Sequence, residues 1–186
     1  ANKIKTDMAN IFTSSIGKKL IMSISGLFLI IFLLLHMTIN CFSVIDAIKG
    51  TWGNADGLFQ LGCDFMALPI VTIMVPVLAF GFVIHIVYAI ILTIQNLNSR
   101  GGYKRYEVSS KAKTDSWASK NMIVLGLIVL GFIAFHLTHF WAEMQLQEFT
   151  GGESANPYAL LEKTFGNPVV CVLYLVWFAA LWFHLT

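Results

Sequence analysis

The sequence is poor in charged residues, in cysteine and in the motifs through which cysteine binds cofactors. Only 12% of its 186 residues are charged, against about 25% in an average soluble domain. Its 3 cysteines form neither a C-x-x-C-H motif nor a C-x-x-C pair. The first absence excludes covalently attached c-type haem, and the second gives no sign of an iron–sulfur cluster. With 57% of its residues hydrophobic, the chain is expected to have lipid as its solvent.

Two further features of the sequence concern a cleavable signal peptide and a possible disulfide. The first 17 residues are mixed and polar, and the first apolar run is longer than the core of a signal peptide, so we expect no cleavable signal. Cys41 and Cys63 fall near one predicted membrane face. A disulfide between them is one interpretation, and ordinary packing of small apolar side chains is the favoured one.

Four long apolar segments define the predicted architecture. They cover about residues 20–42, 65–94, 122–144 and 168–186. A helix needs roughly 20 residues to cross a bilayer, and the fourth segment only just meets this length. We therefore predict an all-α integral membrane protein, a transmembrane helical bundle of four spans that forms a single domain over residues 1–186. The last segment ends without an interfacial anchor, so we expect one more span in the natural protein.

Lysine and arginine are distributed unevenly between the two predicted membrane faces. Of the 12 in the chain, only Lys49 and Lys163 fall outside the N-terminal arm and the segment between the second and third spans. By the positive-inside rule, the N-terminus is cytoplasmic and the acidic loops are external. The net charge of +2 is explained by membrane orientation, and no nucleic-acid partner is expected.

All 5 histidines lie within the predicted spans, where ionisable groups are costly and by default functional. Helical rise places His36 about 25 Å and His136 about 24 Å from the inner surface, so both lie towards the outer face. His85 and His184 lie towards the inner face, because their spans descend from outside. The four histidines therefore form two pairs at two depths, with one histidine in each span.

Two neutral imidazoles from different helices can bind both axial positions of a porphyrin iron, an arrangement suited to electron transfer. We predict an outer haem b on His36 and His136 and an inner haem b on His85 and His184, and these histidines are the predicted metal ligands. The sequence His36-Met37-Thr38 resembles His136-Leu137-Thr138, so the two halves look related.

Other residues near these histidines have more than one interpretation. His139 lies about 4 Å further out than His136, and depth and the repeat favour His136 as the ligand. His139 then binds a haem propionate or a quinone, or faces the interface. Gly81 and Ala180 lie one turn before the inner pair. They permit either close approach of a flat macrocycle or ordinary helix packing.

With these residues in place, the chain resembles the dihaem cytochrome b membrane-anchor subunit of succinate dehydrogenases and quinol:fumarate reductases, in the version found in Bacteroidetes-type bacteria. The resemblance is carried by the run SSIGKKLIMSISG at residues 14–26, leading to His36, and by HLTHFW at residues 136–141. It covers essentially the whole chain. Its specificity lies in the layout of one histidine per span, and the family's ligand positions match the four predicted here.

The resemblance implies a five-helix, multi-pass subunit with two b haems in the bacterial inner (cytoplasmic) membrane. Its implied partners are an iron–sulfur subunit and an FAD-carrying flavoprotein subunit on the cytoplasmic side, together with membrane lipid and menaquinone. Such a subunit passes electrons between menaquinone and the partners' succinate–fumarate site, without dicarboxylate chemistry of its own. The direction of the reaction and a higher oligomer of the complex are left open. Trp182 replaces a glutamate that some fumarate reductases use in proton movement.

The predicted quinone site lies near the outer haem, where polar groups are needed for the quinone carbonyls and for proton exchange. The polar residues at this level are candidates for the site, or else they simply face the interface: Asn40, Gln60, Asp64, His139 and Glu143.

Two alternative functions compete with this one. A dihaem cytochrome b of a hydrogenase or formate dehydrogenase also passes electrons to quinone, but its histidines are usually spread unevenly among the helices. A haem-free membrane transporter or metal-binding protein should show a continuous polar pathway and broken helices. The apolar midplane of the predicted spans disfavours it.

Overall fold

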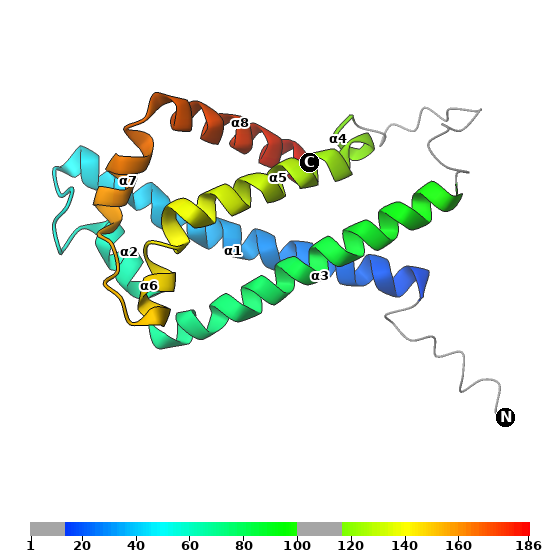
Figure 1. Ribbon diagram of the computed structural model, residues 1–186, viewed down its shortest axis with the longest axis horizontal. Helices are drawn as coiled ribbons and strands as arrows, with labels where there is room; N and C mark the ends of the chain where they lie inside the picture. Colours follow the sequence, from blue (N-terminus) through cyan, green and yellow to red (C-terminus); the bar gives the residue numbers. More distant parts are fainter. Residues whose placement is uncertain (1–13, 100–116) are drawn as a thin grey trace. The chain divides into compact units, whose positions relative to one another are not determined.

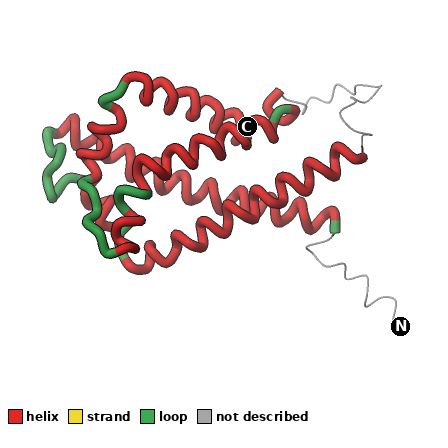
Figure 2. The backbone as a smooth tube through the Cα atoms, in the orientation of Figure 1, coloured by secondary structure: helices red, strands yellow, loops and turns green. Residues whose placement is uncertain are grey.

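The computed structural model describes residues 14–99 and 117–186, and Figure 1 labels the helices of these ranges. The described chain consists of helices and the loops that join them, without a strand (Figure 2). Seven of the predicted inner cations lie outside the described residues: Lys3, Lys5, Arg100, Lys104, Arg105, Lys111 and Lys113.

Four of the described helices are long and apolar enough to cross a membrane. They are α1 (Ser15–Lys49), α3 (Pro69–Ser99), α5 (Met122–His136) with its π-helical continuation η1 (Leu137–Trp141), and α8 (Pro168–Leu185). The prediction of an all-α, multi-pass membrane protein is confirmed.

The ends of these helices differ from the predicted spans for local reasons. Helix α1 has 35 residues and continues beyond the apolar run at 20–42. Helix α3 begins at Pro69, and not at residue 65, because proline lacks the N–H that the first helical position leaves unpaired anyway. Helix α8 also begins with a proline, and the Asn167 side chain caps it by accepting a hydrogen bond from the Val169 N–H at 2.9 Å.

Shorter helices connect the long ones. They are α2 (Leu58–Met66), α4 (Trp117–Lys120), α6 (Gln145–Thr150) and α7 (Pro157–Phe165). Helix α7 begins at a proline after Asn156, whose side chain accepts hydrogen bonds from the N–H groups of Tyr158 and Ala159. These four helices are too short to cross a bilayer.

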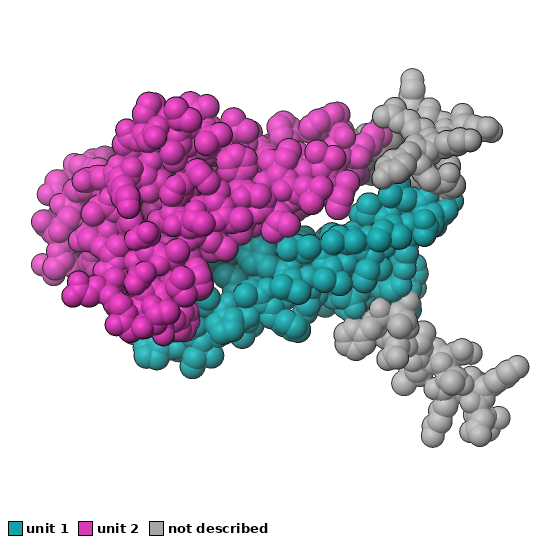
Figure 3. Space-filling model, in the orientation of Figure 1, with its two compact units in different colours: residues 1–40, 68–109 teal, residues 41–67, 110–186 magenta. Residues whose placement is uncertain are grey.

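The chain divides into two compact units, which Figure 3 colours separately. Unit 1 comprises residues 1–40 and 68–109, and unit 2 comprises residues 41–67 and 110–186. Unit 1 contains the first part of α1 together with α3, and unit 2 contains α5 with α8 and the short helices α2, α6 and α7. The single domain predicted over residues 1–186 stays a prediction.

A buried carboxylate holds one end of unit 2 together. Asp46, which is 1% exposed, accepts hydrogen bonds from the N–H groups of Leu58 at 2.9 Å and Phe59 at 2.8 Å. It also accepts the hydroxyl protons of Thr51 at 2.8 Å and Tyr158 at 2.7 Å. The negative charge thus lies at the N-terminus of α2, where unpaired N–H groups and the helix dipole favour it. The same carboxylate fixes α7 through Tyr158.

Aromatic side chains surround this carboxylate. Trp52 and Phe59 contact the ring of Tyr158 edge-on, with ring centroids 4.9 and 5.2 Å apart. The indole N–H of Trp52 donates to Glu162 of α7 at 2.7 Å. Gly57 lies beneath the Tyr158 hydroxyl, and a Cβ at this position would collide with it. These contacts fix α7, which carries part of the cavity described below.

Candidate functional site

In unit 1, the imidazole of His85 lies against the backbone of α1 at Gly26. A Cβ on Gly26 would lie 3.4 Å from Cε1 and 3.8 Å from Nδ1 of His85. Phe28, two residues after Gly26 on α1, fills the space above Gly81 of α3, where a Cβ would come within 2.8 Å of its ring. Each helix thus offers a glycine to a bulky side chain of the other. Of the two interpretations of Gly81, this contact favours helix packing.

A buried hydroxyl fixes the orientation of the His85 ring. Ser25 is 7% exposed, and its Oγ donates a hydrogen bond to the carbonyl of Met22 at 3.0 Å. The same Oγ lies 3.2 Å from His85 Nδ1. A hydroxyl has one proton to donate, so in this pair Nδ1–H is the donor and Oγ the acceptor. The lone pair of the neutral ring is then on Nε2, a nitrogen through which histidine binds metals.

Unit 2 repeats the contact between glycine and histidine. A Cβ on Gly126 of α5 would lie 3.4 Å from Cε1 and 3.8 Å from Nδ1 of His184 on α8. Gly26 precedes His36 by ten residues, and Gly126 precedes His136 by the same ten. The structure therefore extends the repeat seen at His36 and His136 to a glycine, which was not singled out in the sequence.

Each unit places its two predicted ligand histidines at two levels. His85 contacts α1 ten residues before His36, which corresponds to about 15 Å along the helix. His184 contacts α5 ten residues before His136, so unit 2 shows the same separation. The pairing of His36 with His136, and of His85 with His184, stays a prediction because it joins residues of different units.

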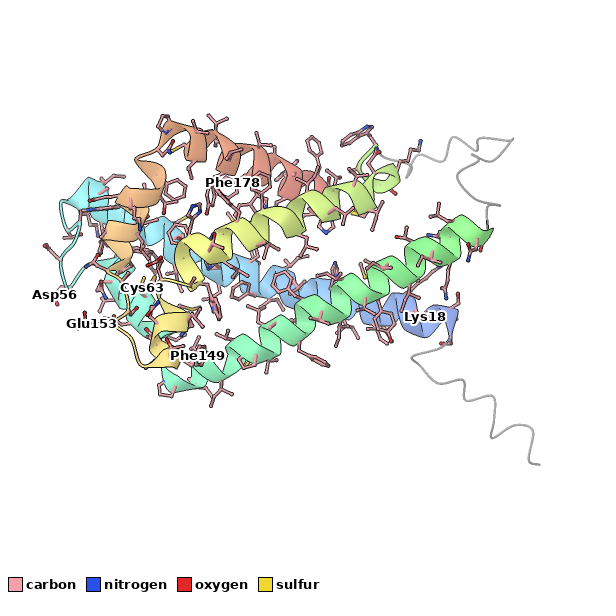
Figure 4. All side chains as sticks on the ribbon, viewed as in Figure 1. Lys18, Asp56, Cys63, Phe149, Glu153 and Phe178 are labelled. Atoms are coloured by element: carbon pink, nitrogen blue, oxygen red, sulfur yellow. The ribbon has the colours of Figure 1, made fainter. Side chains whose placement is uncertain are left out.

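The surroundings of the other two histidines differ. The ring of His36 stacks on Phe32, one turn earlier in α1, with centroids 5.6 Å apart. The ring of His136 lies among aromatic side chains of unit 2, and its centroid is 5.2 Å from that of Phe140 and 5.5 Å from that of Trp177. Figure 4 draws these side chains and labels Phe178 of α8, which stacks on Trp177 at 5.8 Å.

His139 lies in the π-helical turn η1, directly after His136. Such wide turns within α-helices are frequent at functional sites. Nδ1 of His139 lies 3.4 Å from the hydroxyl of Tyr174 on α8, and its ring meets Phe135 edge-on at 4.3 Å. The apolar pattern of the sequence gave no sign of this turn.

A cavity of about 210 Å³ opens beside His139 in unit 2. Helix α7 contributes to it through Lys163 and the buried hydroxyl of Thr164. Its complete lining, from η1 to α8, is Thr138, His139, Glu143, Leu160, Lys163, Thr164, Asn167 and Val170.

The cavity brings together two of the five predicted quinone residues, His139 and Glu143. Gln60 and Asp64 do not line it; the Gln60 amide donates instead to the Asp64 carboxylate at 2.8 Å within α2. Asn40 belongs to unit 1, where its amide donates to the backbone carbonyl of His36 at 2.8 Å.

Sequence reasoning missed the cavity residues contributed by α7 and the start of α8. Lys163 carried the one usable signal, because it is one of only two cations predicted on the outer face. Thr164 and Asn167 gave no signal, since short polar residues near a helix end commonly serve as caps.

The cysteines take no part in this site. All three thiols are free, so Cys41 and Cys63 form no disulfide. Burial, aided by the nearby charge of Asp64, raises the pKa of Cys63 to about 11. Figure 4 labels Cys63 on α2.

The histidines offer the donor groups that a bis-histidine haem needs. Within residues 14–99 and 117–186, no group of three or more His, Cys, Asp or Glu side chains could hold a metal ion. Bis-histidine haem needs only two imidazoles for each iron, because the porphyrin supplies the other ligands. Apolar helix faces and glycine-backed imidazoles are consistent with such a cofactor.

In comparisons with known proteins, no protein-family model, no curated protein and no solved structure matches this chain.

Proposed function

We propose that the chain is the membrane cytochrome b subunit of a succinate:quinone oxidoreductase. In this proposal it passes electrons between menaquinone and the iron–sulfur and flavoprotein subunits of a bacterial inner-membrane complex. The observation that carries the proposal is an arrangement found in both units. A histidine, His85 or His184, rests on a glycine of the neighbouring helix, and that neighbouring helix carries a second histidine about 15 Å further along its axis. A repeat of two ligand levels in both units is what two haems at two depths require.

Each histidine has a defined role in this proposal. His36 and His136 would hold the outer haem, and His85 and His184 the inner one. A bound b haem with both axial positions filled supplies one-electron transfer and leaves no position for oxygen. The glycines let the imidazoles lie close to the neighbouring helix, and the apolar faces of the four long helices exclude water.

We assign the cavity at His139 to the quinone ring. Its volume of about 210 Å³ is below the roughly 300–1,000 Å³ of sites that enclose a whole small molecule, so it suits a ring whose tail lies in lipid. His139 and Glu143 can exchange protons with a quinol, and Lys163 can stabilise negative charge on a quinone oxygen. His139 also lies three residues after His136 in the chain, close to the proposed outer haem.

An optical spectrum of the purified protein tests the haem proposal. Reduced-minus-oxidised bands of b type with about two haems per chain are expected. A preparation that is supplied with haem and contains none would overturn the proposal. Co-purification of a flavoprotein and an iron–sulfur protein is expected as well, and recovery of a hydrogenase or formate dehydrogenase subunit instead would point to the other dihaem family.

Menaquinol-driven reduction of the haems tests the assignment of the cavity. Glu143→Gln and His139→Ala are each expected to slow this reaction about a hundredfold while both haems remain, because acid–base groups contribute factors of this order. Gln60→Ala is the matched control, since Gln60 lies outside the cavity lining. Unchanged rates in both cavity variants would exclude the cavity as the quinone site.

A further inference from the structure

We infer that Ser25 is a positioning residue that selects the tautomer of His85 and thereby tunes one of the two haems. The inference rests on the proposed function, since it assumes that His85 binds haem iron. It goes further by assigning a role to a residue outside the ligand set and by predicting that the ligands at the inner level are not equivalent.

The hydrogen-bond geometry gives Ser25 this role. Its hydroxyl proton is committed to the carbonyl of Met22 at 3.0 Å, within the same helix. At 3.2 Å from His85 Nδ1, the oxygen can therefore only accept. A neutral imidazole that donates from Nδ1 has its lone pair on Nε2, so Ser25 selects the form in which Nε2 is the ligand atom.

Packing makes this selection rigid. Ser25 is 7% exposed, so little water competes for its oxygen. Gly26 follows it directly, and the Nδ1–Cε1 edge of His85 rests against this glycine, with no Cβ to push the ring away. The ring is thus held against α1 by a hydrogen bond at Nδ1 and a close backbone contact at Cε1, and neither uses Nε2, the proposed ligand atom.

Unit 2 has no hydroxyl at the position that corresponds to Ser25. Gly126 contacts His184 at the same distances as Gly26 contacts His85, but the residue before Gly126 is Leu125. A leucine side chain has no atom that can accept a hydrogen bond. Of the two glycine-backed histidines, only His85 is therefore oriented by a hydroxyl from the residue preceding its glycine.

The chemical consequence follows from how neighbours tune histidine ligands. An acceptor on Nδ1–H raises the basicity of Nε2 and fixes the plane of the ring. A more basic ligand stabilises ferric over ferrous iron, so Ser25 lowers the midpoint potential of the haem that His85 binds. Loss of such an interaction typically weakens metal binding about 10- to 100-fold.

Redox titration and electron paramagnetic resonance of the haem-loaded complex test the role of Ser25. Ser25→Ala is expected to keep both haems, move one midpoint potential to a more positive value and shift the low-spin signal of that haem alone. Loss of this haem is expected to be about tenfold faster than in the wild type. Ser25→Thr retains the hydroxyl and should restore the wild-type potential and signal.

Ser23→Ala is the matched control, because Ser23 lies on the exposed face of α1, two residues away. If Ser25→Ala leaves both potentials and both signals unchanged while two haems are bound, the role of Ser25 is wrong and the haem proposal stands. The role is also wrong if Ser25→Thr fails to restore an altered potential. If the wild-type protein binds no haem, the proposed function fails, and the role of Ser25 fails with it.

Discussion

In unit 1 the ring of His85 rests on Gly26 of α1, and in unit 2 the ring of His184 rests on Gly126 of α5, with the same ring edge at the same two distances, 3.4 and 3.8 Å. The side chains around these contacts are different. In unit 1 the residue before the glycine is Ser25, which is hydrogen-bonded to His85, and Phe28 lies over Gly81. In unit 2 the residue before the glycine is Leu125. The common geometry therefore does not depend on one set of neighbours.

The units also differ in how they are held together. Unit 2 has the Asp46 cluster at one end and an aromatic cluster around Trp177, and these contacts join α5, α7 and α8. In the described part of unit 1, the contact between α1 and α3 includes the two glycines and the Ser25 hydrogen bond. The same glycine–histidine contact is therefore accompanied by the Ser25 hydrogen bond and the contact between Phe28 and Gly81 in unit 1, and by a buried carboxylate and aromatic packing in unit 2.

The largest effect is expected at the carboxylate of unit 2. Asp46→Ala should lower the free energy of unfolding by about 3–5 kcal/mol, because two backbone N–H groups and two hydroxyls lose their acceptor together. Thermal unfolding in detergent measures this loss. Asp56→Ala changes an exposed residue of the loop between α1 and α2, and it should change this free energy by less than about 0.5 kcal/mol. Equal melting of the two variants would contradict the role of Asp46.

The next effect tests the glycine contact of unit 1. Gly81→Ala should destabilise the protein by about 1–3 kcal/mol, because the new Cβ would come within 2.8 Å of Phe28. Combining it with Phe28→Ile copies the residues that unit 2 has at the corresponding positions, Ala180 and Ile128. The double variant should lose less stability than the two single variants added together.

Gly131→Ala is the matched control for the glycine contact, because a Cβ at this position meets nothing within 4 Å. It should be neutral or more stable by up to about 1 kcal/mol, since alanine favours helix over glycine. Additive losses in the double variant at positions 28 and 81 would show that Phe28 is not what excludes a side chain at Gly81.

A smaller effect is expected at high pH. Burial, with the hydrogen bond to Asp46, raises the pKa of Tyr158 to about 12 from an ordinary 10.0. Because the folded pKa is the higher one, the stability that this phenol contributes is fully present below about pH 10 and is lost as the pH rises through about 12. Unfolding measured from pH 9 upwards should show this loss in the wild type. Tyr158→Phe, which cannot ionise here, should flatten that part of the profile; an unchanged profile would contradict the assignment.

The smallest effect concerns thiol reactivity and leaves the fold intact. Cys63, with its pKa raised to about 11, should react with an alkylating reagent at pH 8 more slowly than the exposed Cys41. Mass spectrometry after timed labelling measures both rates in one sample. Faster labelling of Cys63 would show that α2 is not packed as described.

The sequence predicted the four spans because long apolar runs have no other stable solution in lipid. It did not predict that α1 reaches Lys49, because an aspartate at position 46 resembles the end of a span until its hydrogen-bond donors are known. The π-helical turn at His139 was also missed, since such a turn depends on packing against α8 and not on apolar periodicity.

The candidate site was predictable only in part. Each histidine is conspicuous by itself in an apolar span, and the rise of the helix is enough to predict its depth in the membrane. The glycines at positions 26 and 126 did not stand out, because glycine is common in transmembrane helices and only the contact with a histidine gives it meaning. The cavity at His139 could not be predicted from the sequence either. It depends on the position of α7, which is fixed by the hydrogen bond between Tyr158 and Asp46, 112 residues earlier in the chain.

The central claim is that each unit supplies two haem ligands, and haem content in single histidine variants tests it most directly. His36→Ala, His85→Ala, His136→Ala and His184→Ala should each retain about one haem per chain, where the wild type has two. His139→Ala should retain both haems. Two haems in any of the first four variants, or one haem in His139→Ala, would contradict the assignment of ligands to the two units.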